Sequence, residues 1–336
     1  MWDFMMKWHL LTTDSNFEKD WNDRLAKQND FNLYQTFNWG AHRERSGWKA
    51  FRWARKNENN ETISMVQVLA KILPFGIVAA WITGGPTGDT DIWVKDIVTL
   101  IKKETASKVL YIRMLNNKPS NEQDARKLIK NGWTRPRTKL RSGLSMLLDL
   151  NNEPEEIKKS FSKNWKHNLR RGEKRNLDIS LWESPDAELI YDLYQSMQQL
   201  KGLDEQFTLE ELKGIFKYMG EYIEVYRCVD ETGRLIALRG CFILGEYGWD
   251  LFAAAASEAR KIYATYVLFW TLMQRSKSLG VKTYDLMGID PENNKGVYNF
   301  KKGTGSKEIK YLGEWEWASL PLLKFAINTA IKYKFL

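Results

Sequence analysis

The sequence predicts a mixed α/β (α+β) protein with two domains. Helix-like and strand-like segments alternate along the 336 residues, and 43% of the residues are hydrophobic, which is enough to bury substantial cores. We place the domain junction at residues 149–154. The two halves show comparable alternation of helix and strand patterns, which suggests a structural duplication, although no sequence repeat is visible.

The first domain is predicted to hold helices at 14–25, 92–103 and 121–130, and strands at 48–55, 63–73, 75–82 and 109–114. A further extended segment is expected at 135–141, where cations at every second position would share one side. These cations are Arg135, Arg137, Lys139 and Arg141. These cations indicate either a row that faces a bound anion or an exposed edge strand whose charges prevent pairing with other chains. We favour the edge strand.

A strongly specified basic helix is predicted to open the second domain. Asn152 and Pro154 suit its start, and Phe161, Trp165 and Leu169 share its apolar side. Helical spacing places on the opposite side the cations Lys159, Lys163, Lys166, Arg170 and Lys174. This cationic side is either an ordinary solvated face or a ridge that binds a polyanion, and we give the two interpretations equal weight.

Helices at 187–200 and 210–219 and strands at 223–229, 235–244 and 247–255 are expected next. An apolar helix at 262–279 then leads to a short strand ending in Asp285. Arg260 and Lys261 at the amino end of that helix oppose its dipole. A bound anion would relieve this conflict, and a hydrated first turn is the alternative.

Composition narrows the function classes. The formal net charge is +9, which favours polyanionic partners such as tRNA, nucleotides or anionic headgroups. Cys228 and Cys241 show no metal or disulfide spacing, and the three histidines form no ligand cluster, so no metal is expected. The beginning of the sequence does not resemble a signal peptide, and we expect a cytoplasmic protein.

The segment 296–305 carries two lysines between glycines and is predicted to be a hinged loop that receives an anion or a developing oxyanion. We favour Lys302 as the catalytic lysine with Lys301 as its rival, because neighbouring side chains diverge. Asp285 is a candidate to orient or deprotonate an amine, or else a structural cap. Tyr266 and Tyr298 are candidates to position substrate, or else buried rings with satisfied hydroxyls.

Four segments in order resemble the Fem family of aminoacyl-tRNA-dependent transferases, which build peptidoglycan interpeptide bridges. They are Tyr266-Val267-Leu268-Phe269-Trp270, Tyr284-Asp285-Leu286-Met287-Gly288, Gly296-Val297-Tyr298-Asn299-Phe300-Lys301-Lys302-Gly303-Thr304-Gly305 and Leu312-Gly313-Glu314. Residues 31–39 and 164–176 are similar more loosely. The sequence departs from the family pattern at Thr304, Met287 and 199–202, and no acid follows Arg113.

The resemblance implies two tandem GNAT-like domains, residues 1–148 completed by a helix at 319–336, and residues 149–318. It implies transfer of an amino acid from aminoacyl-tRNA, as co-substrate and without a cofactor, to a UDP-linked or lipid-linked muropeptide. Substrate contacts are expected from Tyr266, Tyr298, Arg260, Trp39 and Lys201. The basic helix is the first choice for tRNA, and 135–141 the second.

We expect a monomer whose last helix packs on the first domain. Its lysines also permit contact with the inner membrane surface, and we favour packing. Two other classes stay open. An acyl-CoA-dependent GNAT N-acyltransferase would share the fold, although no clear pyrophosphate-binding glycine loop precedes residue 262. A non-catalytic polyanion-binding module is the other.

Overall fold

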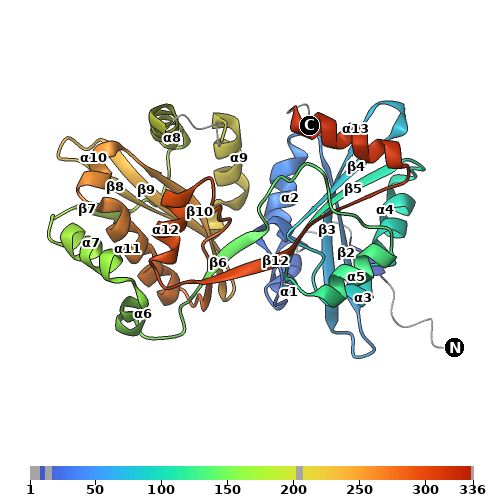
Figure 1. Ribbon diagram of the computed structural model, residues 1–336, viewed down its shortest axis with the longest axis horizontal. Helices are drawn as coiled ribbons and strands as arrows, with labels where there is room; N and C mark the ends of the chain where they lie inside the picture. The colour runs from blue at the N-terminus through green and yellow to red at the C-terminus, as the bar shows by residue number, and fades with distance from the viewer. Residues whose placement is uncertain (1–7, 12–16, 202–206, 334–336) are drawn as a thin grey trace. The chain divides into compact units, whose positions relative to one another are not determined.

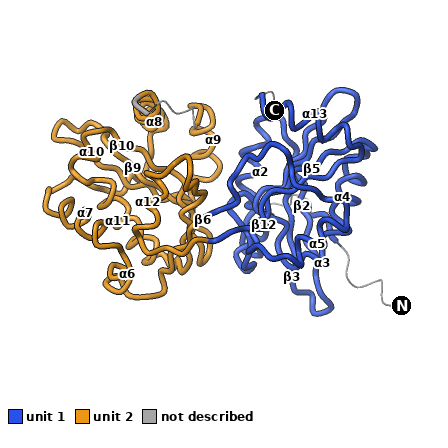
Figure 2. Tube along the Cα trace, viewed as in Figure 1, with its two compact units in different colours: residues 1–144, 309–336 blue, residues 145–308 orange. Residues whose placement is uncertain are grey.

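The computed structural model describes residues 8–11, 17–201 and 207–333, with the side chains of residues 200 and 201 excepted. The chain divides into two compact units, residues 1–144 with 309–336 and residues 145–308 (Figure 2). Strand β12 (Lys307–Ala318) pairs with β5 (Leu110–Pro119) of the first unit. The division therefore falls at residue 308, where the sequence had placed it at 318. Within the described ranges, no helix is long and apolar enough to cross a membrane.

The first unit is a mixed sheet in the order β1-β2-β3-β4-β5-β12 (Figure 1). Only β4 and β5 run parallel, and the other neighbours are antiparallel. The further strands are β1 (Trp8–Leu10), β2 (Lys49–Lys56), β3 (Thr62–Ile72) and β4 (Val78–Thr83). The helices are α1 (Phe17–Leu25), α2 (Phe37–Glu44), α3 (Thr90–Trp93), α4 (Ile97–Thr105), α5 (Glu122–Lys130) and α13 (Pro321–Lys332).

Alternation along β5 gives the first unit two apolar layers. Leu110, Ile112 and Met114 join the core that includes residues of α4 and α5. Tyr111 points to the other face, where it packs with Ile327 and Ile331 of α13. The last helix therefore packs on the first unit, and its Leu322 and Phe325 remain exposed at 76% and 56%.

The second unit is a mixed sheet in the order β6-β11-β10-β9-β8-β7. Only β10 and β11 run parallel. Its strands are β6 (Leu144–Asp149), β7 (Asp178–Leu181), β8 (Ile223–Val229), β9 (Leu235–Leu244), β10 (Tyr247–Ala255) and β11 (Thr283–Asp285). Its helices are α6 (Pro154–Ser160), α7 (Lys163–Glu173), α8 (Ala187–Lys201), α9 (Leu209–Met219), α10 (Ser257–Lys261), α11 (Ala264–Ser278) and α12 (Lys295–Lys302).

Each unit thus has one parallel strand pair joined by helices, α3 and α4 in the first and α10 and α11 in the second, with antiparallel pairs on either side. The predicted mixed α/β class is confirmed. Both cysteines are buried, and burial raises the pKa of Cys228 to about 11 and that of Cys241 to about 12.

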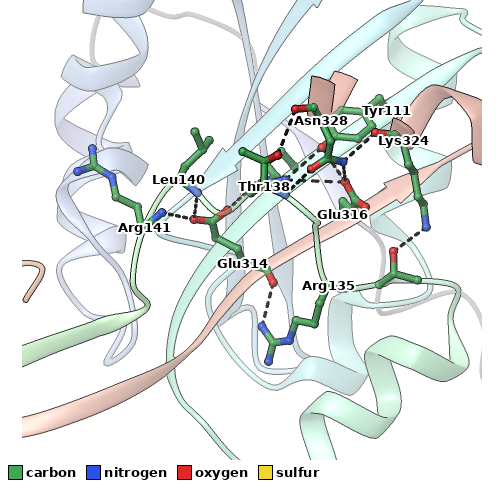
Figure 3. A network of polar contacts seen from close by, with 11 residues as sticks. Tyr111, Arg135, Thr138, Leu140, Arg141, Glu314, Glu316, Lys324 and Asn328 are labelled. Atoms are coloured by element: carbon green, nitrogen blue, oxygen red, sulfur yellow. Dashed lines mark hydrogen bonds and ion pairs between the residues drawn. The ribbon is translucent and has the colours of Figure 1, made fainter. Parts of the chain in front are cut away.

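The strand predicted at 135–141 is wrong. Apart from a bridge at Thr134, this segment is a loop, so it lacks the strand geometry from which a row of cations was predicted. Arg135 donates to the carbonyl oxygens of Leu312 and Glu314 at 2.7 and 2.9 Å, and its guanidinium lies 3.8 Å from the centre of the Trp315 ring. The polar contacts of this loop replace ladder hydrogen bonds (Figure 3).

Candidate functional site

The lysine segment is a helix, where the sequence analysis expected a hinged loop. Helix α12 begins after Asn294, whose side chain accepts from the N–H of Val297 at 3.4 Å. Helix formation here buries Lys301 and exposes Lys302, because adjacent helical side chains point about 100° apart.

The glycines after α12 serve packing within the chain rather than the approach of a ligand. A Cβ on Gly303 would lie 2.7 Å from Cδ1 of Trp165, and a Cβ on Gly305 would lie 2.6 Å from the carbonyl oxygen of Ser160. Gly305 also has a φ of +76°, a conformation that suits glycine. The end of α12 therefore lies directly against the junction between α6 and α7, where the N–H of Ser162 donates to the carbonyl oxygen of Gly303 at 2.8 Å.

Lys301 is a buried ammonium with 7% of its surface exposed. Its Nζ donates to the carbonyl oxygens of Met287 and Gly288 at 3.1 and 2.9 Å. Among the described residues, no carboxylate lies within ion-pair distance of Nζ. Burial lowers the pKa of Lys301 below its usual value, and the negative charge of Asp250 opposes this shift.

Lys302 has a different environment. Its side chain is 61% exposed, and its Nζ lies 3.0 Å from the Tyr298 hydroxyl and 3.7 Å from Oε1 of Glu308. The Tyr298 hydroxyl donates to the same Glu308 oxygen at 2.6 Å. These contacts raise the pKa of Lys302, the Tyr298 hydrogen bond having the largest effect. Lys302 and Tyr298 thus form a surface cluster, and the structure separates the two lysines by burial.

Asp285 positions the backbone that holds Lys301. Its buried Oδ1 accepts from the Ser145 hydroxyl and from the N–H of Met287, the latter at 2.7 Å. Met287 has a φ of +61°, which is rare outside glycine, and its carbonyl oxygen is one of the two that accept from Lys301. Asp285 therefore acts on Lys301 through the turn that follows β11.

Aromatic rings connect Lys301 to the basic helix. The neighbouring Phe300 ring lies 5.7 Å from Trp165 and 5.2 Å from Tyr266, centre to centre. The Tyr266 hydroxyl accepts from the Asn168 amide at 3.0 Å, so its hydroxyl has a partner on α7. Trp165 and Asn168 both belong to α7, and the lysine segment and the basic helix are therefore packed together.

A buried ion pair that was not predicted from the sequence lies beside this cluster. Arg239 on β9 and Asp250 on β10 form two hydrogen bonds of 2.9 and 2.6 Å, with both side chains 7% exposed. The guanidinium carbon lies 4.8 Å from the centre of the Phe269 ring and 5.3 Å from that of Phe300. The sequence signal for this pair was a single charged residue in each of two consecutive, otherwise apolar strand segments.

The basic helix is broken, where one continuous helix had been expected. α6 ends at Ser160, and α7 begins after Ser162, whose hydroxyl accepts from the N–H of Trp165 at 3.3 Å. Trp165 and Leu169 are buried, as predicted for the apolar side. On the other side Lys163, Arg170 and Lys174 are exposed, while Lys166 is half-buried. Lys159 lies on α6 and pairs with Glu156 at 2.5 Å.

Two of the remaining substrate-binding candidates, Arg260 and Trp39, have partners within their own units. Arg260 lies in the short helix α10, four residues before α11 begins at Ala264, and it donates to the carbonyl oxygen of Ala255 at 3.1 Å. Trp39 belongs to α2 of the first unit and packs edge-on against Tyr34, 4.7 Å between ring centres. Lys201 ends α8, and its side chain lies outside what the structure describes.

The chain is similar to known proteins in sequence and in fold. Residues 221–332 match the sequence model of the FemAB family. The solved structure of FemX matches with a TM-score of 0.81 and 16% identity, covering 96% of this chain and all of that one. No curated protein sequence matches the chain.

Two other solved structures share the fold less closely. A tandem GNAT protein from the clavulanic acid biosynthesis pathway matches with a TM-score of 0.55 and 12% identity, over 94% of this chain and 99% of that one. L-PGS from Bacillus licheniformis matches with a TM-score of 0.53 and 14% identity, over 93% and 96%. The resemblance to the Fem family is confirmed in sequence over residues 221–332 and in fold over nearly the whole chain, which has the expected tandem GNAT-like architecture.

Proposed function

We propose that this Fem-like chain is an aminoacyltransferase that moves an amino acid from aminoacyl-tRNA to an amine acceptor. The stem peptide of a peptidoglycan precursor, UDP-linked or lipid-linked, is the acceptor that fits the family match best. The observation that carries the proposal is the buried ammonium of Lys301, held beside the Arg239–Asp250 pair and packed through Phe300 against the basic helix.

The reaction is favoured by a hydrogen-bond donor, and more strongly by a charged one, at the reacting carbonyl. The neutral acceptor amine attacks the ester carbonyl carbon of the donor, and a tetrahedral oxyanion forms. The bond from that carbon to the ribose oxygen then breaks, while the amine loses a proton and the ribose oxygen gains one. Direct attack of this kind needs no covalent enzyme intermediate.

Lys301 suits the role of oxyanion donor better than Lys302. Of its three N–H groups, two are directed to the carbonyl oxygens of Met287 and Gly288, and this fixes where the third can point. Burial strengthens its interaction with a developing negative charge, since fewer waters compete. The exposed Lys302 ammonium has water and Glu308 as neighbours, so its interaction with an oxyanion would be weaker.

The exposed cations of α7 suit the tRNA backbone. Lys163, Arg170 and Lys174 lie on the side of α7 opposite Trp165, and Trp165 contacts the ring beside Lys301. Phosphate contacts of this kind fix a nucleic acid in position without reading its sequence. Because the donor and the UDP-linked acceptor are cytoplasmic molecules, we place the activity in the cytoplasm.

A donor competition assay tests the proposal. The purified chain is incubated with muropeptide acceptors and either a mixture of charged tRNAs or a mixture of acyl-CoAs, and product masses are recorded. We expect an acceptor enlarged by one amino acid residue, formed only with charged tRNA and abolished by RNase treatment.

Product formation from acyl-CoA that resists RNase would replace the proposal with an acyl-CoA-dependent GNAT N-acyltransferase. Binding of tRNA without loss of the ester or formation of product would replace it with a polyanion-binding module.

A further inference from the structure

The first unit carries a cluster of exposed apolar side chains on and around α13. Large apolar residues exposed by 49% or more include Leu320, Leu322, Phe325 and Tyr333 at this helix, Leu140 in the loop 134–141, Ile72 at the end of β3 and Phe75 in the turn that follows. Phe75 is 99% exposed and Leu322 76%. Other exposed large apolar residues in the described ranges, such as Ile129 and Leu189, lie on separate helices.

Contacts join these segments into one surface, which we call the α13 surface and define as residues 71–77, 106–109, 134–141 and 320–333. Leu73 and Leu323 pack on the same apolar cluster as Ile327 and Ile331. The Ser107 hydroxyl donates to the carbonyl oxygen of Gly76 at 3.1 Å.

The loop 134–141 is fastened to α13 and to β12 (Figure 3). The N–H and hydroxyl groups of Thr138 donate to the side-chain and main-chain oxygens of Asn328 at 3.0 and 3.2 Å. The carboxylate of Glu314 accepts from the N–H groups of Leu140 and Arg141, and Glu314 is itself paired with the buried Arg113. The loop is therefore held in one conformation, and its charged side chains project from a fixed backbone.

The charge of the α13 surface is of a single sign. Its four segments contain no aspartate or glutamate and eight cations, Lys71, Lys108, Arg135, Arg137, Lys139, Arg141, Lys324 and Lys332. Cationic and apolar side chains lie close together in at least one place, where the Arg137 guanidinium is 5.9 Å from the centre of the Phe325 ring. Exposed apolar side chains with basic neighbours match a bilayer, which offers hydrocarbon below a layer of anionic headgroups.

We propose that the α13 surface docks on a lipid bilayer that contains anionic headgroups, with Phe75, Leu322 and Phe325 entering the interface and the basic loop contacting the headgroups. This partner goes beyond the transfer reaction and does not depend on it. A second protein copy is a poorer occupant, because two copies of an all-cationic surface would repel each other.

Vesicle sedimentation tests the proposal with the full chain. Vesicles of phosphatidylglycerol mixed with phosphatidylcholine are expected to bind the protein, and vesicles of phosphatidylcholine alone to bind it far more weakly. Added salt is expected to weaken binding to the mixed vesicles.

Matched triple variants locate the contact. The variant Phe75→Ser, Leu322→Ser, Phe325→Ser is expected to bind mixed vesicles at least about tenfold more weakly, because three apolar side chains no longer enter the interface. The control Ile129→Ser, Leu189→Ser, Leu279→Ser removes exposed apolar side chains elsewhere and is expected to bind like the parent. All six positions are exposed by 41% or more, so both variants should keep the parent melting temperature.

A charge variant tests the second component of the surface. Arg137→Gln with Lys139→Gln is expected to weaken binding to mixed vesicles and its salt dependence, while Arg126→Gln with Lys130→Gln on α5 is expected to change neither.

Three results would overturn the proposal: equal binding of the parent protein to both vesicle types, equal loss of binding in the two triple variants, or a dimer in light scattering that the first triple variant disrupts. Failure of this docking proposal can be distinguished from failure of the proposed transfer function, since vesicle binding requires neither donor nor acceptor. The aminoacyl transfer rate of the first triple variant is therefore measured with a soluble acceptor. We expect that rate to equal the parent rate.

Discussion

Replacing Gly305 with alanine is expected to disrupt the contact between the end of α12 and the α6–α7 junction. An alanine at the φ of +76° costs roughly 1–2 kcal/mol in local strain. Its Cβ would also lie 2.6 Å from both the carbonyl oxygen and the hydroxyl oxygen of Ser160, and relieving this overlap costs about 1–3 kcal/mol more. The free energy of unfolding should therefore fall by roughly 2–5 kcal/mol.

Thermal and urea unfolding followed by circular dichroism measure this change. At about 2–4 °C per kcal/mol for a unit of this size, the midpoint should fall by at least roughly 4 °C. The matched control is Gly296→Ala on the same helix, where a Cβ meets nothing within 4 Å. Alanine there should leave stability unchanged or raise it by up to about 1 kcal/mol. Equal midpoints for the two variants would refute the assignment of Gly305 to packing.

Three further predictions concern the charged groups of the second unit. Burial lowers the pKa of Lys301, and the negative charge of Asp285 opposes that shift. Asp285→Asn should therefore lower the pKa of Lys301 further and move the alkaline decline of the pH profile of kcat to lower pH. A decline at the parent pH would contradict this effect of Asp285 on Lys301. Arg239→Met leaves the buried Asp250 unpaired and should lower the free energy of urea unfolding by about 3–5 kcal/mol, with partial recovery when Asp250→Asn is added. Lys163→Gln with Arg170→Gln should raise KM for aminoacyl-tRNA and weaken the salt dependence of that KM, with little effect on kcat. The control Lys213→Gln on α9 should leave KM and its salt dependence unchanged. A drop in kcat at constant KM would argue against a phosphate-binding helix.

Local signals in the sequence determined much of the second unit. The bounds of β8, β9 and β10 agree with the predicted strands, because Asp230–Gly233 and Gly245-Glu246 mark the turns between apolar runs. The break between α6 and α7 had a local signal too, since Ser162 is a favourable N-cap residue, but the strong apolar periodicity across it masked that signal.

Long-range contacts decided the features that were not predicted. Gly296 and Gly303 suggest a loop by propensity, whereas in the structure Gly303 ends a helix and packs against Trp165, which lies far away in the sequence. The period-two cations at 135–141 suggest a strand, while Arg135 and Glu314 form contacts far apart in sequence that hold a loop. Burial of Lys301 likewise depends on the turn at Met287, which no local pattern reports.

In the proposed reaction Lys301, and not Lys302, stabilises the oxyanion. Single-turnover transfer from charged tRNA tests it with Lys301→Met and Lys302→Met, variants of identical chemistry at neighbouring positions. We expect a rate loss of about 10²–10³-fold for Lys301→Met in protein that still melts cooperatively, and a rate near that of the parent for Lys302→Met. A large loss for Lys302→Met with a near-parent rate for Lys301→Met would contradict it.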